Sequence, residues 1–175
     1  MICLITGGAR SGKSTYAQKE ALRLSANPVY VATAKYTTND PEFSARVQRH
    51  KEERNEQWIN YEEPLYVSGL ALAKKIVVID CVTLWLSNFF SLLNMNVGAC
   101  LQGLQKEIDT LSEIEALFFI VTNEIGMGVH ADTEIGRRFT DLQGWANQYI
   151  AGKADKVILM VSGIPVIIKQ KEHVI

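Results

Sequence analysis

A glycine-rich stretch near the N-terminus carries the strongest chemical signal in the sequence. It runs Gly7-Gly8-Ala9-Arg10-Ser11-Gly12-Lys13-Ser14 and matches the pattern G-x-x-x-x-G-K-[ST] in full. Glycines let the backbone curl so that successive N–H groups point at one anion, and a helix that begins at Lys13 adds its own free N–H groups. We expect Lys13 to reach the phosphates as a catalytic group and the Ser14 hydroxyl to ligate Mg²⁺. The stretch therefore predicts a P-loop.

A carboxylate at the end of another apolar run is the expected partner of this P-loop. Asp80 closes the run Ile76–Asp80, and P-loop enzymes hold their metal with a carboxylate at the end of a neighbouring strand. We therefore expect Asp80 to bind Mg²⁺, directly or through water. The alternative is that Asp80 caps a helix that begins near Leu84. The guanine motif N-K-x-D is absent, which argues against a signalling GTPase.

A basic segment between Asp40 and Trp58 holds a candidate nucleophile. Arg46, His50 and Arg54 are spaced at i, i+4 and i+8, so they share one face of a helix. Surrounding cations disfavour the imidazolium form, and neutral imidazole is a nucleophile. The same cations could hold a triphosphate and stabilise charge at the attacked phosphorus. The alternative is a solvated helix face on which glutamates balance the arginines.

Short β-branched runs alternate with longer helical patterns along the chain. The predicted strands are Ile2–Thr6, Val29–Thr33, Ile76–Asp80, Leu117–Thr122 and Val157–Ser162, with a further strand in the tail at Ile164–Lys169. The predicted helices are Lys13–Leu24, Asp40–Trp58, Leu84–Leu93, Val97–Ile114 and Asp132–Ala151. This alternation predicts a three-layer α/β fold with a mostly parallel sheet, here a P-loop NTPase of the RecA-like kind. Ligands of such sheets bind beyond the carboxyl ends of the strands.

Composition narrows the class of protein. The 175 residues are 47% hydrophobic and 21% charged, with a net charge of −1, which fits a single domain over residues 1–175. This charge gives no general affinity for nucleic acid or an anionic membrane. Three cysteines without metal-ligand spacing indicate reduced thiols in a cytoplasmic protein. We expect no signal peptide and no membrane span, because neither pattern occurs.

Several stretches recur here in one order: GGARSGKS, VYVAT, ARVQRHKEERNEQW followed by Glu62, IDCVTLWLSN, VTNEIGMGV, and RRFTDLQGWANQYIA with VSGIPVIIK. Over essentially the whole chain this order resembles the bifunctional adenosylcobinamide kinase/adenosylcobinamide-phosphate guanylyltransferase family of cobalamin biosynthesis. The resemblance implies that ATP or GTP phosphorylates adenosylcobinamide. It also implies that GTP then transfers GMP to that phosphate through a guanylyl-histidine at His50, which releases adenosylcobinamide-GDP and pyrophosphate.

The resemblance also implies nucleotide contacts and a quaternary state. The implied contacts are Gly7 through Ser14, Thr33, Ala34, Lys35, Lys51, Glu52, Glu53, Arg54, Glu62 and Asp80. The family includes trimers, so a homo-oligomer is implied. One departure is that the family often has a Val-Pro pair after Val129, where this chain has His130-Ala131.

Two other functions remain open at this point. One is a small-molecule P-loop kinase without the transferase step, in which His50 has no role. The other is a binding module in which a nucleotide only orders a surface for a partner. The sequence leaves open the general base of the kinase step and the residues that contact the corrinoid. Trp58, Trp85 and Trp145 could line the corrinoid site, although packing is the more frequent role of tryptophan.

Overall fold

The computed structural model describes residues 1–35 and 56–172. Its elements, in chain order, are β1 (Ile2–Gly7), α1 (Lys13–Leu24), β2 (Val29–Ala32), β3 (Ile59–Glu62), η1 (Val67–Gly69), β4 (Ile76–Asp80), α3 (Val82–Leu92), α4 (Val97–Glu113), β5 (Leu117–Val121), η2 (Ile125–Met127), α5 (Glu134–Lys153), β6 (Lys156–Val161) and β7 (Ile164–Gln170). The elements η1 and η2 are single turns of 3₁₀ helix. Within the described ranges no helix is both long and apolar enough to cross a membrane.

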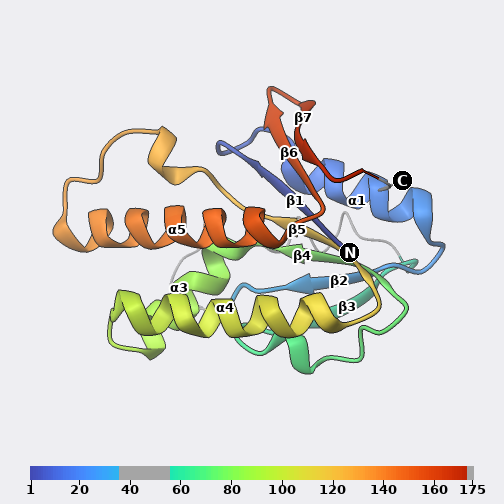
Figure 1. Ribbon diagram of the computed structural model, residues 1–175, viewed down its shortest axis with the longest axis horizontal. Coiled ribbons are helices and arrows are strands. Elements are labelled where there is room, and N and C mark those ends of the chain that lie inside the picture. Colours follow the sequence, from blue (N-terminus) through green and yellow to red (C-terminus); the bar gives the residue numbers. More distant parts are fainter. Residues whose placement is uncertain (36–55, 173–175) are drawn as a thin grey trace.

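The described strands form one seven-stranded sheet in the order β3-β2-β4-β5-β1-β6-β7 (Figure 1). The pairs from β3 to β6 are parallel, and β7 pairs with β6 in the antiparallel direction. Val121 on β5 is in register with Ile5 on β1 and with Asp80 on β4. The carboxyl ends of these strands therefore lie at the same edge of the sheet, where parallel α/β proteins bind their ligands.

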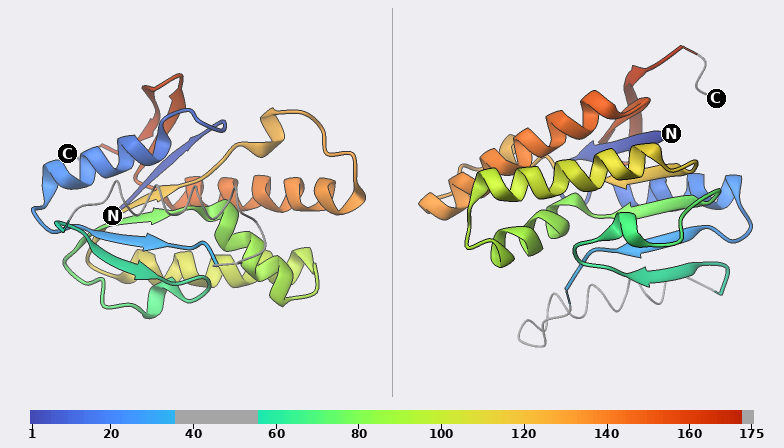
Figure 2. Two further views of the ribbon diagram at one scale, coloured as in Figure 1. Left: turned by 180° about the vertical axis from the view of Figure 1, so that it is seen from behind. Right: turned by 60° about the horizontal axis from the view of Figure 1, so that its bottom comes forward.

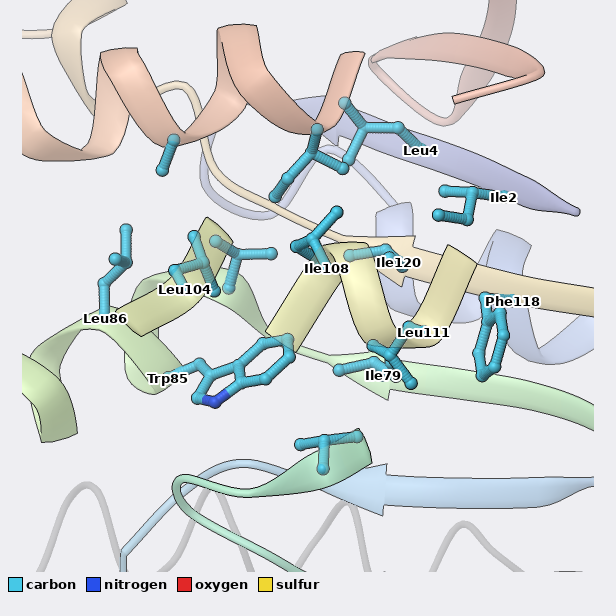
Figure 3. Packing of buried hydrophobic residues seen from close by; sticks show 14 of the residues in the cluster. Ile2, Leu4, Ile79, Trp85, Leu86, Leu104, Ile108, Leu111, Phe118 and Ile120 are labelled. Carbon is cyan, nitrogen blue, oxygen red and sulfur yellow. The ribbon is translucent and has the colours of Figure 1, made fainter. Parts of the chain in front are cut away.

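Helices cover both faces of the sheet, because side chains of each strand alternate between two cores. Leu4 packs with side chains of α3, α4 and α5, whereas Ile5 packs with Ala17 and Ala21 of α1. Figure 2 shows α4 and α5 running alongside each other on the face opposite α1. Figure 3 shows that Trp85, at the centre of the larger core, lies close to the side chains of α4. Its indole N–H donates to Leu65 O at 2.8 Å, which satisfies the one polar atom of this buried side chain.

The three-layer fold with a mostly parallel sheet is confirmed, and most expected elements agree within two residues. The strand β3 was not expected, because its sequence INYE is only four residues long and its side chains are largely exposed at the sheet edge. The helix expected to continue to Trp58 does not include residues 56–58, since Glu56 and Gln57 form a turn. The rest of that expected helix lies outside the described residues.

Asp155 forms hydrogen bonds that link the start of β1 to the residue that follows β7. Its Oδ2 accepts from the Ile2 N–H at 2.9 Å, and its Oδ1 accepts from Lys171 Nζ at 2.7 Å. Burial alone would raise the pKa of Asp155, but the hydrogen bonds from Lys171 and Ile2 outweigh it and hold the pKa below its usual range. A depressed pKa stabilises the fold above the unfolded-state value, near 3.9, and this contribution is lost as the pH falls through the folded-state value.

We therefore expect Asp155→Asn to lower the free energy of unfolding by about 1 kcal/mol at pH 7 and by less at pH 3. The measurement is urea unfolding at both pH values. Asp132→Asn, at an exposed position, is the control and should change little. An equal loss at both pH values would contradict a role for the Asp155 charge.

Candidate active site

The glycine-rich stretch forms the loop between β1 and α1. Gly7 and Gly12 have φ angles of 147° and 93°, which side chains rarely adopt. A Cβ atom on Gly7 would lie 2.6 Å from Met160 O, so the loop packs tightly on β6. The helix begins at Lys13, and its N-terminus has no side-chain cap within the described part of the chain. Its first N–H groups are thus available for an anion.

Lys13 is buried within this loop. Its Nζ donates to Gly8 O at 2.5 Å and lies 3.4 Å from Ser11 Oγ. Burial lowers the pKa of Lys13, and the carboxylates of Asp80 and Glu124 only partly offset this effect. Burial also raises the pKa of Cys81 to about 12, so this nearby thiol is neutral near pH 7. The charge of Lys13 is therefore balanced by two carboxylates at the same edge of the sheet.

Asp80 ends β4. We expected this strand to be a neighbour of the P-loop strand, but it is not. The strand β5 lies between β4 and β1, so Asp80 is two strand spacings, about 10 Å, from the end of β1. The Asp80 Oδ2 accepts from Tyr30 OH at 2.9 Å. The N-cap of α3 is Cys81, so the alternative that Asp80 caps this helix is wrong.

Glu124 is a site residue that the sequence did not single out. It follows β5, and its N–H donates to Gly7 O at 3.1 Å. The hydroxyl of Thr6, on β1, donates to Glu124 Oε1. Glu124 belongs to the stretch VTNEIGMGV, which contributed to the family resemblance but was not considered residue by residue. Its position beside the P-loop depends on strand order, which spacing along the chain does not reveal.

A buried polar network holds the segment that carries Glu124. The Thr122 hydroxyl donates to Asn147 Oδ1 at 2.7 Å, and Gln143 Nε2 donates to both of these oxygens. Asn147 Nδ2 donates to Asn123 O at 3.0 Å, and Asn123 Nδ2 donates to Thr83 Oγ1 at 3.0 Å. Networks of this kind restrict a segment to one conformation, because each broken bond leaves a buried polar group without a partner. The network therefore links β5 to α5 and α3.

The expected nucleotide contacts after β2 lie beside Asp80. The Thr33 N–H donates to Asp80 O at 3.2 Å, and its hydroxyl donates to Cys81 O at 2.8 Å. Ala34 is half-buried and Lys35 is exposed, at the end of the described segment. Glu62 is exposed at the carboxyl end of β3, in register with Ala32. It is four strand spacings from β1, about 19 Å, so it can contact the nucleoside but not the phosphates held by the loop.

The remaining expected residues, His50, Lys51, Glu52, Glu53 and Arg54, lie outside the described residues. They belong to the segment that joins β2 to β3 in the chain.

The described residues contain no group of three or more His, Cys, Asp or Glu side chains that could hold a metal ion. Mg²⁺ does not need such a group, since it is bound through one or two protein oxygens together with substrate phosphates and water. The Ser14 hydroxyl and the Asp80 carboxylate are oxygen donors of this kind. The donor chemistry at the sheet edge therefore fits Mg²⁺.

An open pocket of about 520 Å³ lies between α5 and the segment that follows Glu124. Its walls include Gly126, the exposed His130, the half-buried Ala131 and the half-exposed indole of Trp145. Trp58 and Trp85 do not contribute, because both are buried in the cores. Gly126, the lining residue nearest in sequence to Glu124, connects the pocket to the segment that follows β5.

Comparison with known proteins identifies the family. The family described as cobinamide kinase/cobinamide phosphate guanyltransferase matches residues 3–168. The chain belongs to this family. The bifunctional adenosylcobalamin biosynthesis protein CobP of Pseudomonas aeruginosa is 36% identical over 171 residues, which cover 95% of this chain and 96% of that protein. The bifunctional adenosylcobalamin biosynthesis protein CobU of Escherichia coli is 33% identical over 187 residues, which cover 97% of this chain and all of that protein.

A solved structure supports the fold. The KaiC-like protein of Pyrococcus horikoshii superimposes with a TM-score of 0.51 at 16% identity, over 98% of this chain and 80% of that protein. This similarity concerns the fold alone and confirms the RecA-like P-loop architecture. The family that the motifs predicted is thus confirmed, and with it nucleotide binding at the P-loop.

The two adjacent glycines of the loop allow a matched test of its packing. Gly7→Ala should lower the free energy of unfolding by about 2 kcal/mol or more, because the new methyl group meets the backbone of β6 at a strained φ. Gly8→Ala is the control, since a Cβ there has no neighbour within 4 Å. Urea unfolding of both variants measures the difference, and equal midpoints would contradict the packing described here.

Proposed function

We propose that this chain catalyses both reactions of its family within a single nucleotide-binding domain, residues 1–175. In the first, ATP or GTP phosphorylates the hydroxyl of adenosylcobinamide. In the second, GTP transfers GMP to the new phosphate, and adenosylcobinamide-GDP and pyrophosphate are the products. The observation that best supports this proposal is the complete P-loop, with Lys13 buried in it, in a chain whose bifunctional relatives align over almost their full length.

For the kinase step, the loop and Lys13 hold the triphosphate tail. The backbone N–H groups of the loop and the start of α1 bind phosphate oxygens, and Lys13 exchanges Gly8 O for the β- and γ-phosphates. Ser14 and Asp80 would hold Mg²⁺, which would supply neutralisation of charge on the phosphate oxygens. Catalysis of phosphoryl transfer depends mainly on such positioning and charge stabilisation.

For the guanylyl step, the neutral imidazole of His50 attacks the α-phosphorus. A P–N bond forms, the bond between the α-phosphorus and the bridging oxygen breaks, and pyrophosphate leaves with its charge held by the P-loop. The phosphate of the acceptor then attacks the guanylyl-histidine and releases His50. Lys51, Glu52, Glu53 and Arg54 adjoin His50 in the sequence, while Thr33, Ala34, Lys35 and Glu62 contact the nucleoside.

We also propose that the chain acts in the cytoplasm as a homo-oligomer. The β6–β7 hairpin supports association, because Ile164, Ile167 and Ile168 are 65%, 54% and 59% exposed, and contiguous exposed apolar residues mark interaction surfaces. The three cysteines are all buried free thiols, which is compatible with a reducing compartment.

The test traps the covalent intermediate. Incubation with Mg²⁺ and GTP labelled at the α-phosphate, followed by denaturation, should leave label that is stable in base and lost in acid, as expected of a phosphoramidate. His50→Ala should abolish this label and spare most of the kinase step, whereas His173→Ala serves as the control and should retain the label.

Full labelling of His50→Ala would contradict the assignment of the nucleophile. Kinase activity without any label would favour a simple kinase. Nucleotide binding with neither activity would favour a binding module.

A further inference from the structure

We propose that Glu124 is the general base of the kinase step and that the acceptor alcohol reaches it through the pocket between α5 and the segment after η2. This inference rests on the proposed function and adds to it a catalytic residue and an acceptor site. It follows from one carboxylate that lies beside the P-loop strand and two residues before Gly126, which lines an open pocket.

Strand order places Glu124 next to the transferred phosphoryl group. The strand β5 pairs directly with the P-loop strand, and the Glu124 N–H is bonded to Gly7 O, the first residue of the loop. The negative charge of the Glu124 carboxylate also acts on Lys13 of the loop, so the two groups belong to one electrostatic environment. Asp80 is less suited to this role, because it lies one strand further away and accepts a hydrogen bond from Tyr30.

A hydrogen bond orients the Glu124 carboxylate and leaves its second oxygen able to accept a proton. Thr6 donates to Oε1, whereas Oε2 accepts no hydrogen bond from the residues that the structure describes. The network through Asn123 and Asn147 fixes the backbone on the other side. A base held in this way needs little reorganisation when it accepts a proton.

The pocket provides a route for the acceptor. Gly126, two residues after Glu124, forms part of its wall, and its volume of about 520 Å³ is typical of small-ligand sites. The pocket is open, so it can take the alcohol-bearing arm of an acceptor whose bulk remains outside. The indole of Trp145, 48% exposed, offers an apolar face, while Arg137 and Asp141 offer polar groups for amides of the substrate.

In the proposed kinase step, Glu124 and the two substrates account for every bond and proton that changes. The acceptor oxygen forms a bond to the γ-phosphorus, and the bond from that phosphorus to the β–γ bridging oxygen breaks. The hydroxyl proton passes to Glu124 Oε2, and the nucleoside diphosphate leaves with the electron pair. Glu124 returns its proton to water after the products depart. The guanylyl step needs no such base, because neither imidazole nor the phosphate dianion must lose a proton to attack.

This difference between the two reactions supplies the experiment. Glu124→Gln should lower kcat of the kinase about 100-fold or more, with KM for the nucleotide within threefold, and should leave labelling from α-labelled GTP unchanged. Glu124→Asp, which retains the charge, should recover part of the kinase activity. The control is Glu115→Gln, an exposed position just before the amino end of β5, which should alter neither reaction.

An equal loss of labelling and kinase activity in Glu124→Gln would overturn the proposal and indicate instead that Glu124 helps to bind phosphate in both reactions. Unchanged kinase activity in this variant would also overturn the proposal. Wild-type protein that neither labels nor phosphorylates would instead refute the proposed function itself. If Glu124→Gln does not fold, as judged by circular dichroism, Glu124→Asp decides through the same comparison of the two reactions.

The acceptor pocket is tested separately. Trp145→Ala should raise KM for adenosylcobinamide at least threefold, without a change in labelling from GTP. An unchanged KM would overturn the assignment of the pocket.

Discussion

The direct pairing of β5 with the P-loop strand is the constraint on which the arrangement of the site depends. Because Ile5 and Val121 are in register, the residues that follow both strands emerge at the same edge of the sheet. Glu124 then lies one strand spacing from the P-loop and Asp80 lies two. Carboxylates at two distances from a polyphosphate tail can do different work, one close to the transferred group and the other at the metal.

The buried charge of Lys13 explains why the surroundings of this edge are so polar. An ammonium group removed from water is costly unless it is paired and hydrogen-bonded. Gly8 O serves as its partner in the absence of phosphate, and Asp80 and Glu124 supply opposite charge. The network around Asn147 then holds the segment after β5, so that Glu124 does not move away. The loop is thus arranged for a polyanion before one binds, which is the basis of electrostatic preorganisation.

Local sequence patterns predicted much of this fold, but they did not predict which strands are neighbours. The P-loop, β1, α1 and β4 follow from apolar runs and glycine positions that act over a few residues. The strand β3 lies at an edge, is largely exposed and spans only four residues, so its short alternating pattern is a weak signal. Glu124 was missed, and Asp80 was expected one strand too close, because the insertion of β5 between β4 and β1 is set by packing of the whole chain. His50 was predicted as the nucleophile from its cationic neighbours and the family resemblance, and it lies outside the described residues.

The order of elements along the sheet edge also bears on how one site serves two reactions. The P-loop holds the end of the triphosphate, and Glu62, the expected nucleoside contact, lies four strands away on β3. If Glu62 contacts the nucleoside, a nucleotide held by the P-loop extends across the carboxyl ends of β5, β4 and β2. The segment that carries His50 joins β2 to β3, whereas the pocket that we assign to the acceptor begins just after β5. Under the proposed roles, the acceptor alcohol and His50 belong to separate parts of the chain, one at the pocket after β5 and one in the sequence between β2 and β3, while the same P-loop holds the triphosphate in both reactions.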